Sequence, residues 1–190
     1  MREKGFTLIE LLIVVAIIAI LAAIAIPNFL EAQVRSKVSR AKADMRTIAT
    51  ALESYFTDAN HYPNHSENGW PYYLTRQLTT PTRYLSSAML HDPFKDTGHA
   101  AKHTSDYSRR YRYLNSEAWL EKWKDNTGAQ SDVMETNDVS DTIGGWKLVS
   151  AGPDKKETVG GLIYDPTNGT YSLGDIIRTQ KESNVVKSRD

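Results

Sequence analysis

Cysteine is absent from this chain of 190 residues. Disulfide bonds, thiolate metal sites and a cysteine nucleophile are therefore excluded, and the cellular compartment must be inferred from other features. A net charge is also lacking, because 23 basic residues balance 23 acidic ones. Proteins that bind nucleic acids usually present a basic surface, so the balanced charge gives no reason to propose a nucleic acid as partner.

Motifs that carry catalysis are missing too. No glycine-rich phosphate loop, nucleophile elbow or pair of catalytic carboxylates stands out. Two pairs of histidines are spaced four residues apart, His61 with His65 and His99 with His103. Such a pair binds zinc when a helix presents both rings on one face. His61 lies two residues before a proline and His99 follows a glycine, so we interpret the histidines as surface residues and predict no enzyme.

One uninterrupted apolar run covers residues 11–26. A helix needs about 20 apolar residues, at a rise of about 1.5 Å each, to cross a hydrocarbon core of about 30 Å. The run is therefore long enough to span a membrane. The mean hydropathy of the whole chain is nevertheless -0.48, so the remainder is markedly polar. The length suits one globular domain attached to an anchor.

Glu10 lies just before this run, where an unpaired carboxylate in a membrane costs a few kcal/mol. Two interpretations of the N-terminus leave it unexplained. A secretory signal peptide would use Arg2 and Lys4 as its basic region and would be cleaved near Ala25, although a strong helical pattern continues beyond that point. A plain membrane anchor accounts for the length alone.

Residues 4–10, with the sequence KGFTLIE, resemble the processing site of type IV pilins and type II secretion pseudopilins. The resemblance implies that a membrane peptidase cleaves between Gly5 and Phe6 and methylates the new N-terminus at Phe6. It also implies that the carboxylate of Glu10 pairs with the α-amino group of a neighbouring subunit. Pro27 stands where the family has its helix-kinking proline, so we expect the helix to kink or melt locally there.

This resemblance supplies a partner that the chain otherwise lacks. No basic side chain lies between Phe6 and Arg35, so the amine that neutralises Glu10 exists only after cleavage. An opposite charge in a low-dielectric setting favours both ionised forms. Such a pair would also hold the axial register of one helix on the next.

A helical pattern continues beyond Pro27. Apolar residues recur alternately four and three positions apart and line one face. They are Val34, Val38, Ala41, Met45, Ile48, Leu52 and Tyr55. We expect this face to pack on the protein's own sheet rather than in a coiled coil. Pro63 cannot continue a helix, so one helix of about fifty residues should end near residue 59. Residues 52–63 are similar to the helix end of the major pseudopilin.

The remaining residues predict a small antiparallel sheet packed on the second half of the helix, which is an α+β, pilin-like fold. Strands are expected at residues 111–114 and 146–150, with a hairpin over 162–173 that turns at Asn168 and Gly169. A short helix is expected over 72–78, a turn at 91–94 and a long loop over 115–144. Expected core residues are Leu74, Leu78, Tyr84 and Leu85.

Five segments follow from these patterns. They are a leader peptide at 1–5, a transmembrane helix at 6–28, an amphipathic helical extension at 29–62, a globular head at 63–178 and a polar tail at 179–190. The head includes a C-terminal loop and the hairpin. The tail lacks periodicity, so we expect it to be disordered.

The C-terminal loop is the candidate metal site. Residues 150–154 and 174–176 resemble the two ends of the loop that binds calcium in the major pseudopilin. Calcium accepts about six to eight oxygen ligands in flexible geometry. The resemblance implies Asp154 and Asp175 as ligands, and Asp165 could replace an acid that the family often has at Gly174. Alternatively, Asp154 and Asp165 simply serve turns, which aspartate favours.

The resemblance implies a structural subunit of a type II secretion pseudopilus, a short periplasmic filament that helps to export folded proteins. Its implied partners are further copies of the chain, minor pseudopilins, prepilin peptidase and an inner-membrane secretion platform with a cytoplasmic ATPase. Arg2 and Lys4 predict a single-pass inner-membrane protein with a cytoplasmic N-terminus and a periplasmic head.

Two alternative functions stay open. A type IV pilin would serve adhesion, motility or DNA uptake, but such pilins often close a C-terminal disulfide loop that this chain cannot form. An exported enzyme or binding protein could also carry a pilin-like N-terminus. That alternative requires a catalytic constellation in the head.

Overall fold

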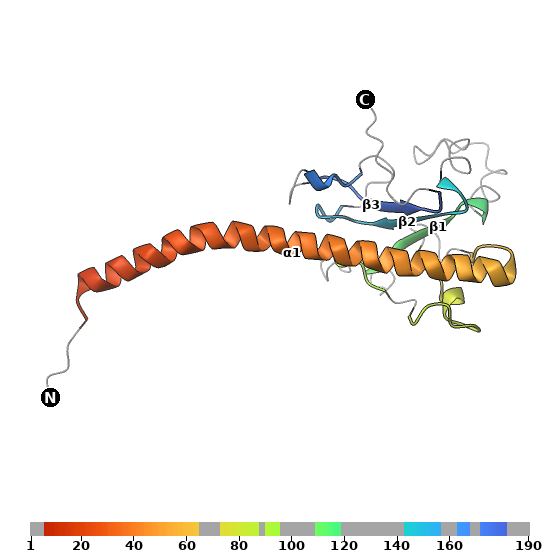
Figure 1. Cartoon of the computed structure of the whole chain (residues 1–190), viewed down its shortest axis with the longest axis horizontal. Helices are drawn as coiled ribbons and strands as arrows, with labels where there is room; N and C mark the ends of the chain where they lie inside the picture. Colours follow the sequence, from red (N-terminus) through yellow and green to blue (C-terminus); the bar gives the residue numbers. More distant parts are fainter. Residues whose placement is uncertain are drawn as a thin grey trace, which may run out of the picture.

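The computed structural model describes residues 6–64, 73–87, 90–95, 109–118, 143–156, 163–167 and 172–181. One long helix, α1 (Leu8–Ala59), carries a small head along its C-terminal half (Figure 1). The head contains the short 3-10 helix η1 (Arg76–Leu78) and the strands β1 (Arg112–Asn115), β2 (Trp146–Ser150) and β3 (Ile176–Thr179). This is the pilin-like α+β arrangement that the sequence predicts.

Local chemistry sets both ends of α1. Thr7 caps the N-terminus with an extended backbone. At the other end Asn60 adopts the left-handed conformation, with φ 56°, and its N–H donates to the carbonyl of Phe56 at 2.8 Å. Asparagine tolerates this conformation better than most residues, which makes it a common helix terminator. The predicted end of the helix is confirmed.

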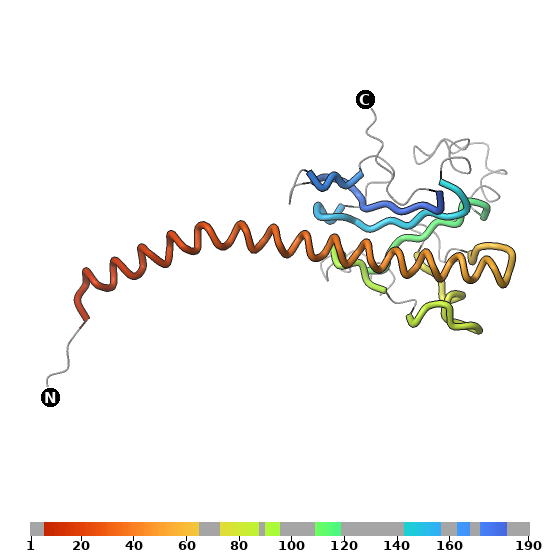
Figure 2. The backbone as a smooth tube through the Cα atoms, in the orientation of Figure 1, coloured from red at the N-terminus to blue at the C-terminus, as the bar shows by residue number. Residues whose placement is uncertain are grey.

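Pro27 lies inside α1, and the helix continues through it. Figure 2 shows the N-terminal half of α1 as a smooth curve without a break. The prediction of local melting at Pro27 is therefore wrong, and a gradual bend takes the place of a sharp kink. A proline removes one backbone hydrogen bond and crowds the preceding turn, and a helix this long retains its other bonds on both sides.

The C-terminal half of α1 buries one face against the head. The buried side chains are Val38, Ala41, Met45, Ile48, Ala49, Ala51 and Leu52. Val34 and Tyr55 are partly buried at the two ends of this stripe. The predicted core face is therefore confirmed, and it packs on the protein's own sheet. Complete burial of a side chain such as Leu52 stabilises the fold by about 1.5–3 kcal/mol.

The sheet is antiparallel with the order β1-β2-β3. In the middle strand Trp146, Leu148 and Ser150 are buried, whereas Lys147 and Val149 are half-buried. This alternation places one face of the sheet on α1. The predicted strand at 146–150 coincides with β2, and the predicted strand at 111–114 is shifted by one residue from β1.

Strand β3 was not predicted, and the expected start of a disordered tail at Thr179 is wrong. Thr179 pairs with Lys147 in the sheet. Beyond the strand, the N–H of Gln180 donates to the carbonyl of Trp146 at 3.2 Å. A polar segment gains order when its backbone pairs with a neighbouring strand, which composition does not reveal. Residues 182–190 of the expected tail lie outside the described residues.

The expected hairpin over 162–173 is also wrong at the positions that the structure describes. Ile163 forms a parallel bridge with Asp175, and the N–H of Tyr164 donates to the carbonyl of Asp175 at 2.9 Å. Ile163 therefore pairs next to the start of β3, and not antiparallel with residues 171–173 as expected. The predicted turn at Asn168 and Gly169 lies outside the described residues, as does most of the long loop expected over 115–144.

The short helix expected over 72–78 contracts to η1. Thr75 caps it, and Tyr73 forms an isolated bridge with Arg112 of β1. A residue held in a bridge to a strand cannot also belong to a helical turn, so the helix starts later. The expected core residues Leu74, Leu78 and Leu85 are buried, and Tyr84 is half-buried.

The predicted turn at 91–94 is confirmed, and it places a buried carboxylate at the centre of the head. Asp92 is 1% exposed and accepts hydrogen bonds from the N–H of Phe94, the hydroxyl of Ser150 and the N–H of Ala151, at 2.8–3.0 Å. Burial raises the pKa of Asp92, and these three bonds oppose that rise. Asp92 thereby ties this turn to the end of β2.

Candidate functional site

The N-terminal half of α1 projects away from the head (Figure 1). Its large apolar side chains, over residues 6–30, are between 45% and 80% exposed. An 18-residue window of this helix has a mean hydropathy of 3.2 and contains no residue buried within the chain. Apolar surface of this extent is stable in lipid or against other apolar helices. The protein is therefore anchored in a membrane by one span.

Glu10 lies in the first turn of this apolar helix, where it forms a capping box with Thr7. One carboxylate oxygen, Oε2, accepts the backbone N–H of Thr7 at 2.9 Å and its hydroxyl at 2.6 Å. The N–H of Glu10 donates in turn to the hydroxyl oxygen of Thr7 at 3.4 Å. The positive end of the helix dipole also favours a carboxylate here.

The capping box gives Glu10 hydrogen-bond partners within its own chain, but it supplies no counter-charge. The signal was present in the sequence, because a threonine followed three residues later by a glutamate is the pattern of a capping box. Both bonds from Thr7 go to Oε2, so among the described residues Oε1 stays open to a cation. Phe6 lies next to this carboxylate in the chain and is 75% exposed. Gly5 lies outside the described residues.

The C-terminal loop does not gather its aspartates as predicted. Asp154 accepts the N–H of Gly174 and the N–H of Lys156, each at 3.3 Å. Asp175 is 1% exposed at the start of β3. Over the described ranges no three acidic or histidine side chains form a group that could hold a metal ion. The described residues therefore give the expected donor set of Asp154, Asp165 and Asp175 no support.

Asp165 serves a turn, as the alternative interpretation held. Its Oδ1 accepts the N–H of Thr167 at 2.8 Å and the hydroxyl of Thr167 at 2.6 Å. These bonds hold the pKa of Asp165 below its usual value. Aspartate favours such turns because its short side chain reaches the backbone two residues ahead. Calcium binding at this loop therefore stays a prediction.

The two ends of the C-terminal loop touch each other at Gly152. Its φ is +67°, and a Cβ at this position would lie 2.1 Å from the carbonyl oxygen of Gly174. Only glycine permits this backbone conformation together with this approach. The motif at 150–154 therefore closes the loop and supports Asp92, a role that was not recognised from the sequence.

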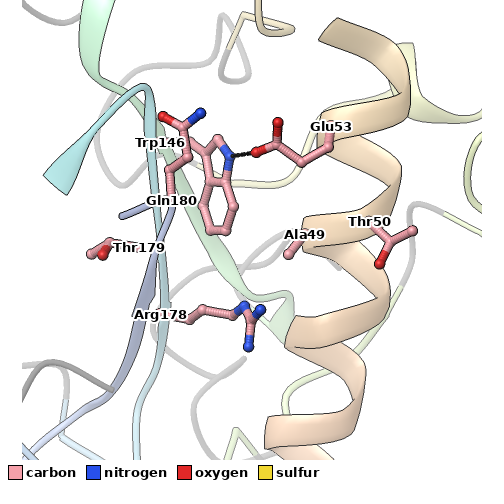
Figure 3. Close-up of a pocket in the computed structure, with 7 residues that line it drawn as sticks. All are labelled: Ala49, Thr50, Glu53, Trp146, Arg178, Thr179 and Gln180. Atoms are coloured by element: carbon pink, nitrogen blue, oxygen red, sulfur yellow. Dashed lines mark hydrogen bonds between the residues drawn. The ribbon is translucent and has the colours of Figure 1, made fainter. Parts of the chain in front are cut away.

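A polar cluster joins the end of α1 to the sheet. Glu53 accepts a hydrogen bond from Nε1 of Trp146 at 2.9 Å (Figure 3) and one from the hydroxyl of Tyr62 at 3.1 Å. Gln180 donates to the same hydroxyl at 2.5 Å. Burial and the neighbouring charge of Glu53 raise the pKa of Tyr62 to about 12. No local signal could have found this cluster, because its members lie far apart in the sequence.

A pocket of about 510 Å³ opens beside this cluster, between α1 and β3 (Figure 3). It is lined by Ala49, Thr50, Glu53, Trp146, Arg178, Thr179 and Gln180. The pocket lies near the C-terminal end of α1, far from the apolar half of the helix.

Two family models match the chain. Residues 1–26 match the prokaryotic N-terminal methylation motif, and residues 28–117 match type II secretion system (T2SS), protein G. The first match covers the capping box and the apolar run. The second covers the core face of α1 and the head through β1, and it leaves β2 and β3 outside.

Curated relatives match part of the chain as well. The type IV major pilin protein PilA of Myxococcus xanthus is 59% identical over 61 residues, which are 32% of this chain and 28% of that protein. The type II secretion system core protein G of Pseudomonas aeruginosa is 43% identical over 63 residues, or 33% of this chain and 44% of that protein. Its counterpart in Pectobacterium carotovorum is 31% identical over 80 residues, or 42% of this chain and 51% of that protein.

The chain thus spans between 28% and 51% of the length of these relatives. No solved structure matches it. The similarity is concentrated in the helix and the first part of the head.

Proposed function

We propose that this chain, which resembles type IV pilins and pseudopilins over residues 1–117, is a structural subunit of a type II secretion pseudopilus. One observation carries the proposal. A helix with an exposed apolar half carries a glutamate in its capped first turn and continues into a head whose helix and first strand match protein G. Helices of this kind pack together as the core of a filament when they leave the membrane.

Processing would create the assembly site. Cleavage after Gly5 by prepilin peptidase leaves Phe6 with a methylated amine next to the first turn of α1. The capping box holds one oxygen of Glu10 and leaves the other available, so a neighbour's amine can bind without breaking the helix N-terminus. The carboxylate thereby enters the apolar region with hydrogen bonds already formed and gains its counter-charge on assembly.

The function is mechanical rather than catalytic. Apolar helices exchange lipid contacts for contacts with one another as subunits join, so little free energy is stored in that step. The work of pushing a folded protein outward would come from a cytoplasmic ATPase through the inner-membrane platform. In this arrangement the N-terminus faces the cytoplasm, the head lies in the periplasm, and minor pseudopilins complete the filament.

A type IV pilin is the second candidate, because identity to the Myxococcus pilin reaches 59% over 61 residues. That stretch is short, and the N-terminal helix is the part that all such filament subunits have in common. The match of residues 28–117 to protein G reaches into the head, so it favours the pseudopilus.

Mass spectrometry of the protein extracted from membranes tests the processing step. We expect a mature N-terminus at Phe6 that is heavier by one methyl group. A mature N-terminus at Ile26 would show a signal peptide and would overturn the proposal. Deletion of the gene in its host should then block export of folded proteins while surface motility continues, whereas the opposite pair of results would indicate a type IV pilin.

A further inference from the structure

Arg178 occupies an unusual position in β3. It lies opposite Leu148 of β2, whose side chain is fully buried on the face that packs against α1. Directly opposed residues of antiparallel strands point to the same face, so Arg178 also points toward α1. β3 has only β2 as a neighbour in the sheet, so the arginine lies at the edge of the core. Figure 3 shows its guanidinium reaching into the pocket beside α1.

Arg178 forms no ion pair with the described residues, although one carboxylate lines the same pocket. Glu53 is the one acid among its lining residues, and Trp146 and Tyr62 already donate hydrogen bonds to that carboxylate. The ion pairs of Glu31 with Arg35 and of Arg40 with Asp44 do not involve Arg178. The Nε of Arg178 is buried there and makes no hydrogen bond.

A carboxylate is the ligand that this arrangement fits. The guanidinium presents N–H groups in a planar fork that matches the two oxygens of a carboxylate. The guanidinium end of Arg178 projects into the pocket, so its terminal N–H groups are the ones an entering carboxylate can reach. The volume of about 510 Å³ admits a side chain from another molecule.

The symmetry of a filament indicates where the carboxylate comes from. An open helical assembly of identical subunits joins two different surfaces of the same chain, one on each side of every contact. The pocket lies toward the C-terminal end of α1, whereas residues 163–167 lie at the end of the sheet that faces the apolar half of α1 (Figure 1). These two surfaces meet when heads follow one another along an axis parallel to α1.

Asp165 is the suitable acid on the second surface. Its side chain is exposed, and the two hydrogen bonds from Thr167 both go to Oδ1. Neither of these bonds uses Oδ2, whereas both oxygens of Asp154 accept bonds from backbone N–H groups. The lowered pKa of Asp165 keeps this carboxylate charged.

We propose that the pocket between α1 and β3 is an assembly site, in which Arg178 of one subunit binds the Asp165 carboxylate of the next copy along the filament. This inference rests on the proposed function, because it requires that the chain forms filaments.

Charge reversal in the full-length processed chain tests the contact. Arg178→Glu and Asp165→Arg should each lower the yield of filaments about tenfold, and the double variant should recover to within about twofold of wild type. Arg76→Glu is the matched control, since it makes the same charge change at an exposed position of η1 and should assemble normally. Single variants that assemble like wild type, or a double variant no better than the singles, would overturn the contact.

Cysteine cross-linking gives a second readout that does not depend on filament yield. The chain has no cysteine, so Thr50→Cys in the pocket and Thr167→Cys beside Asp165 supply the only thiols, and each single variant shows the cross-links that two identical positions form. We expect covalent oligomers from filaments of the double cysteine variant. Ser54→Cys with Thr167→Cys, which moves one thiol out of the pocket, should give none. Intact filaments without cross-links in the first pair would also overturn the contact, whereas a wild-type chain that forms no filament would instead contradict the proposed function.

Discussion

The two halves of α1 are both continuous helix, but they differ in which side chains they expose. The N-terminal half exposes large apolar side chains around its circumference, and Glu10 is its only ionisable residue before Glu31. The C-terminal half buries a single stripe and exposes basic side chains such as Arg35 and Arg46. The first half is therefore stable only in lipid or against other helices, whereas the second half is stabilised by the head.

The two halves of α1 also differ in where their polar groups find hydrogen-bond partners. In the apolar half, Glu10 is satisfied by the capping residue of its own helix. In the other half, Glu53 is satisfied by Trp146 and Tyr62, which come from the head. A membrane span must satisfy its polar groups locally or through another subunit, while a helix covered by a domain can use distant parts of the chain. The comparison predicts that substitutions in the N-terminal half of α1 affect filament assembly, whereas substitutions in its C-terminal half affect folding of the head.

Replacement of Glu10 should have the largest effect on assembly. Glu10→Leu removes the carboxylate, so we expect complete loss of filaments with no change in the melting temperature of the head. Glu10→Gln is the informative companion, because glutamine can still complete a capping box but carries no charge. Filaments from the glutamine variant would show that capping rather than charge pairing is what assembly requires. Electron microscopy of membrane-extracted protein and circular dichroism of the head measure the two effects.

Shortening a buried side chain in the C-terminal half of α1 should instead destabilise the head. Leu52 is fully buried, so Leu52→Ala should destabilise the head by about 2–5 kcal/mol and lower its melting temperature by about 10 °C or more. Leu12→Ala is the matched control, because Leu12 is 67% exposed in the apolar half, and it should leave the melting temperature of the head unchanged. Equal melting temperatures for the two variants would show that the core face is assigned to the wrong half.

Alkaline pH should weaken the head while leaving the apolar half unaffected. The folded head raises the pKa of Tyr62 from 10.0 to about 12, so the folded state retains a proton that the unfolded state loses. This contribution to stability is fully present below pH 10 and is lost as the pH rises toward 12. Tyr62→Phe should flatten the fall in melting temperature over that window. An unchanged slope in Tyr62→Phe would show that Glu53 and burial do not perturb this phenol.

Calcium should have the smallest effect. The three aspartates of the C-terminal loop do not converge, so saturating calcium should shift the melting temperature of the head by less than about 1 °C relative to a chelator. A rise of several degrees would mean that ligands come from residues 157–162 or 168–171, and it would restore the prediction made from the sequence. Asp154→Asn is the variant that should abolish such a rise.

Local signals made α1 predictable. An apolar run of membrane length, a stripe of apolar residues spaced four and three apart, and Pro63 beyond the end together predict its position to within two residues. The capping box is equally local, because it depends only on the spacing of Thr7 and Glu10. Strand β2 was predictable for the same reason, since its alternation spans five residues.

The head was predicted less well because its contacts are distant in sequence. β3 contributes four residues to the sheet, too few for a period to show, and its order comes from pairing with β2. Asp165 and Asp175 match a loop pattern, yet one serves a turn and the other starts a strand. Carboxylates that match a sequence motif need not lie close together in space, because the path of the intervening chain sets the distances between them.

The sequence thus specified the helix, its apolar and amphipathic halves and the resemblance to filament subunits, since each depends on residues within a few turns of one another. Folding in three dimensions placed Glu53 under Trp146, Asp92 against the end of β2, and Arg178 in a pocket beside α1. Those contacts join residues between about 50 and 130 positions apart, and their geometry follows from closing long loops around a common core. The local periodicity of the sequence does not indicate which distant residues these loops bring together.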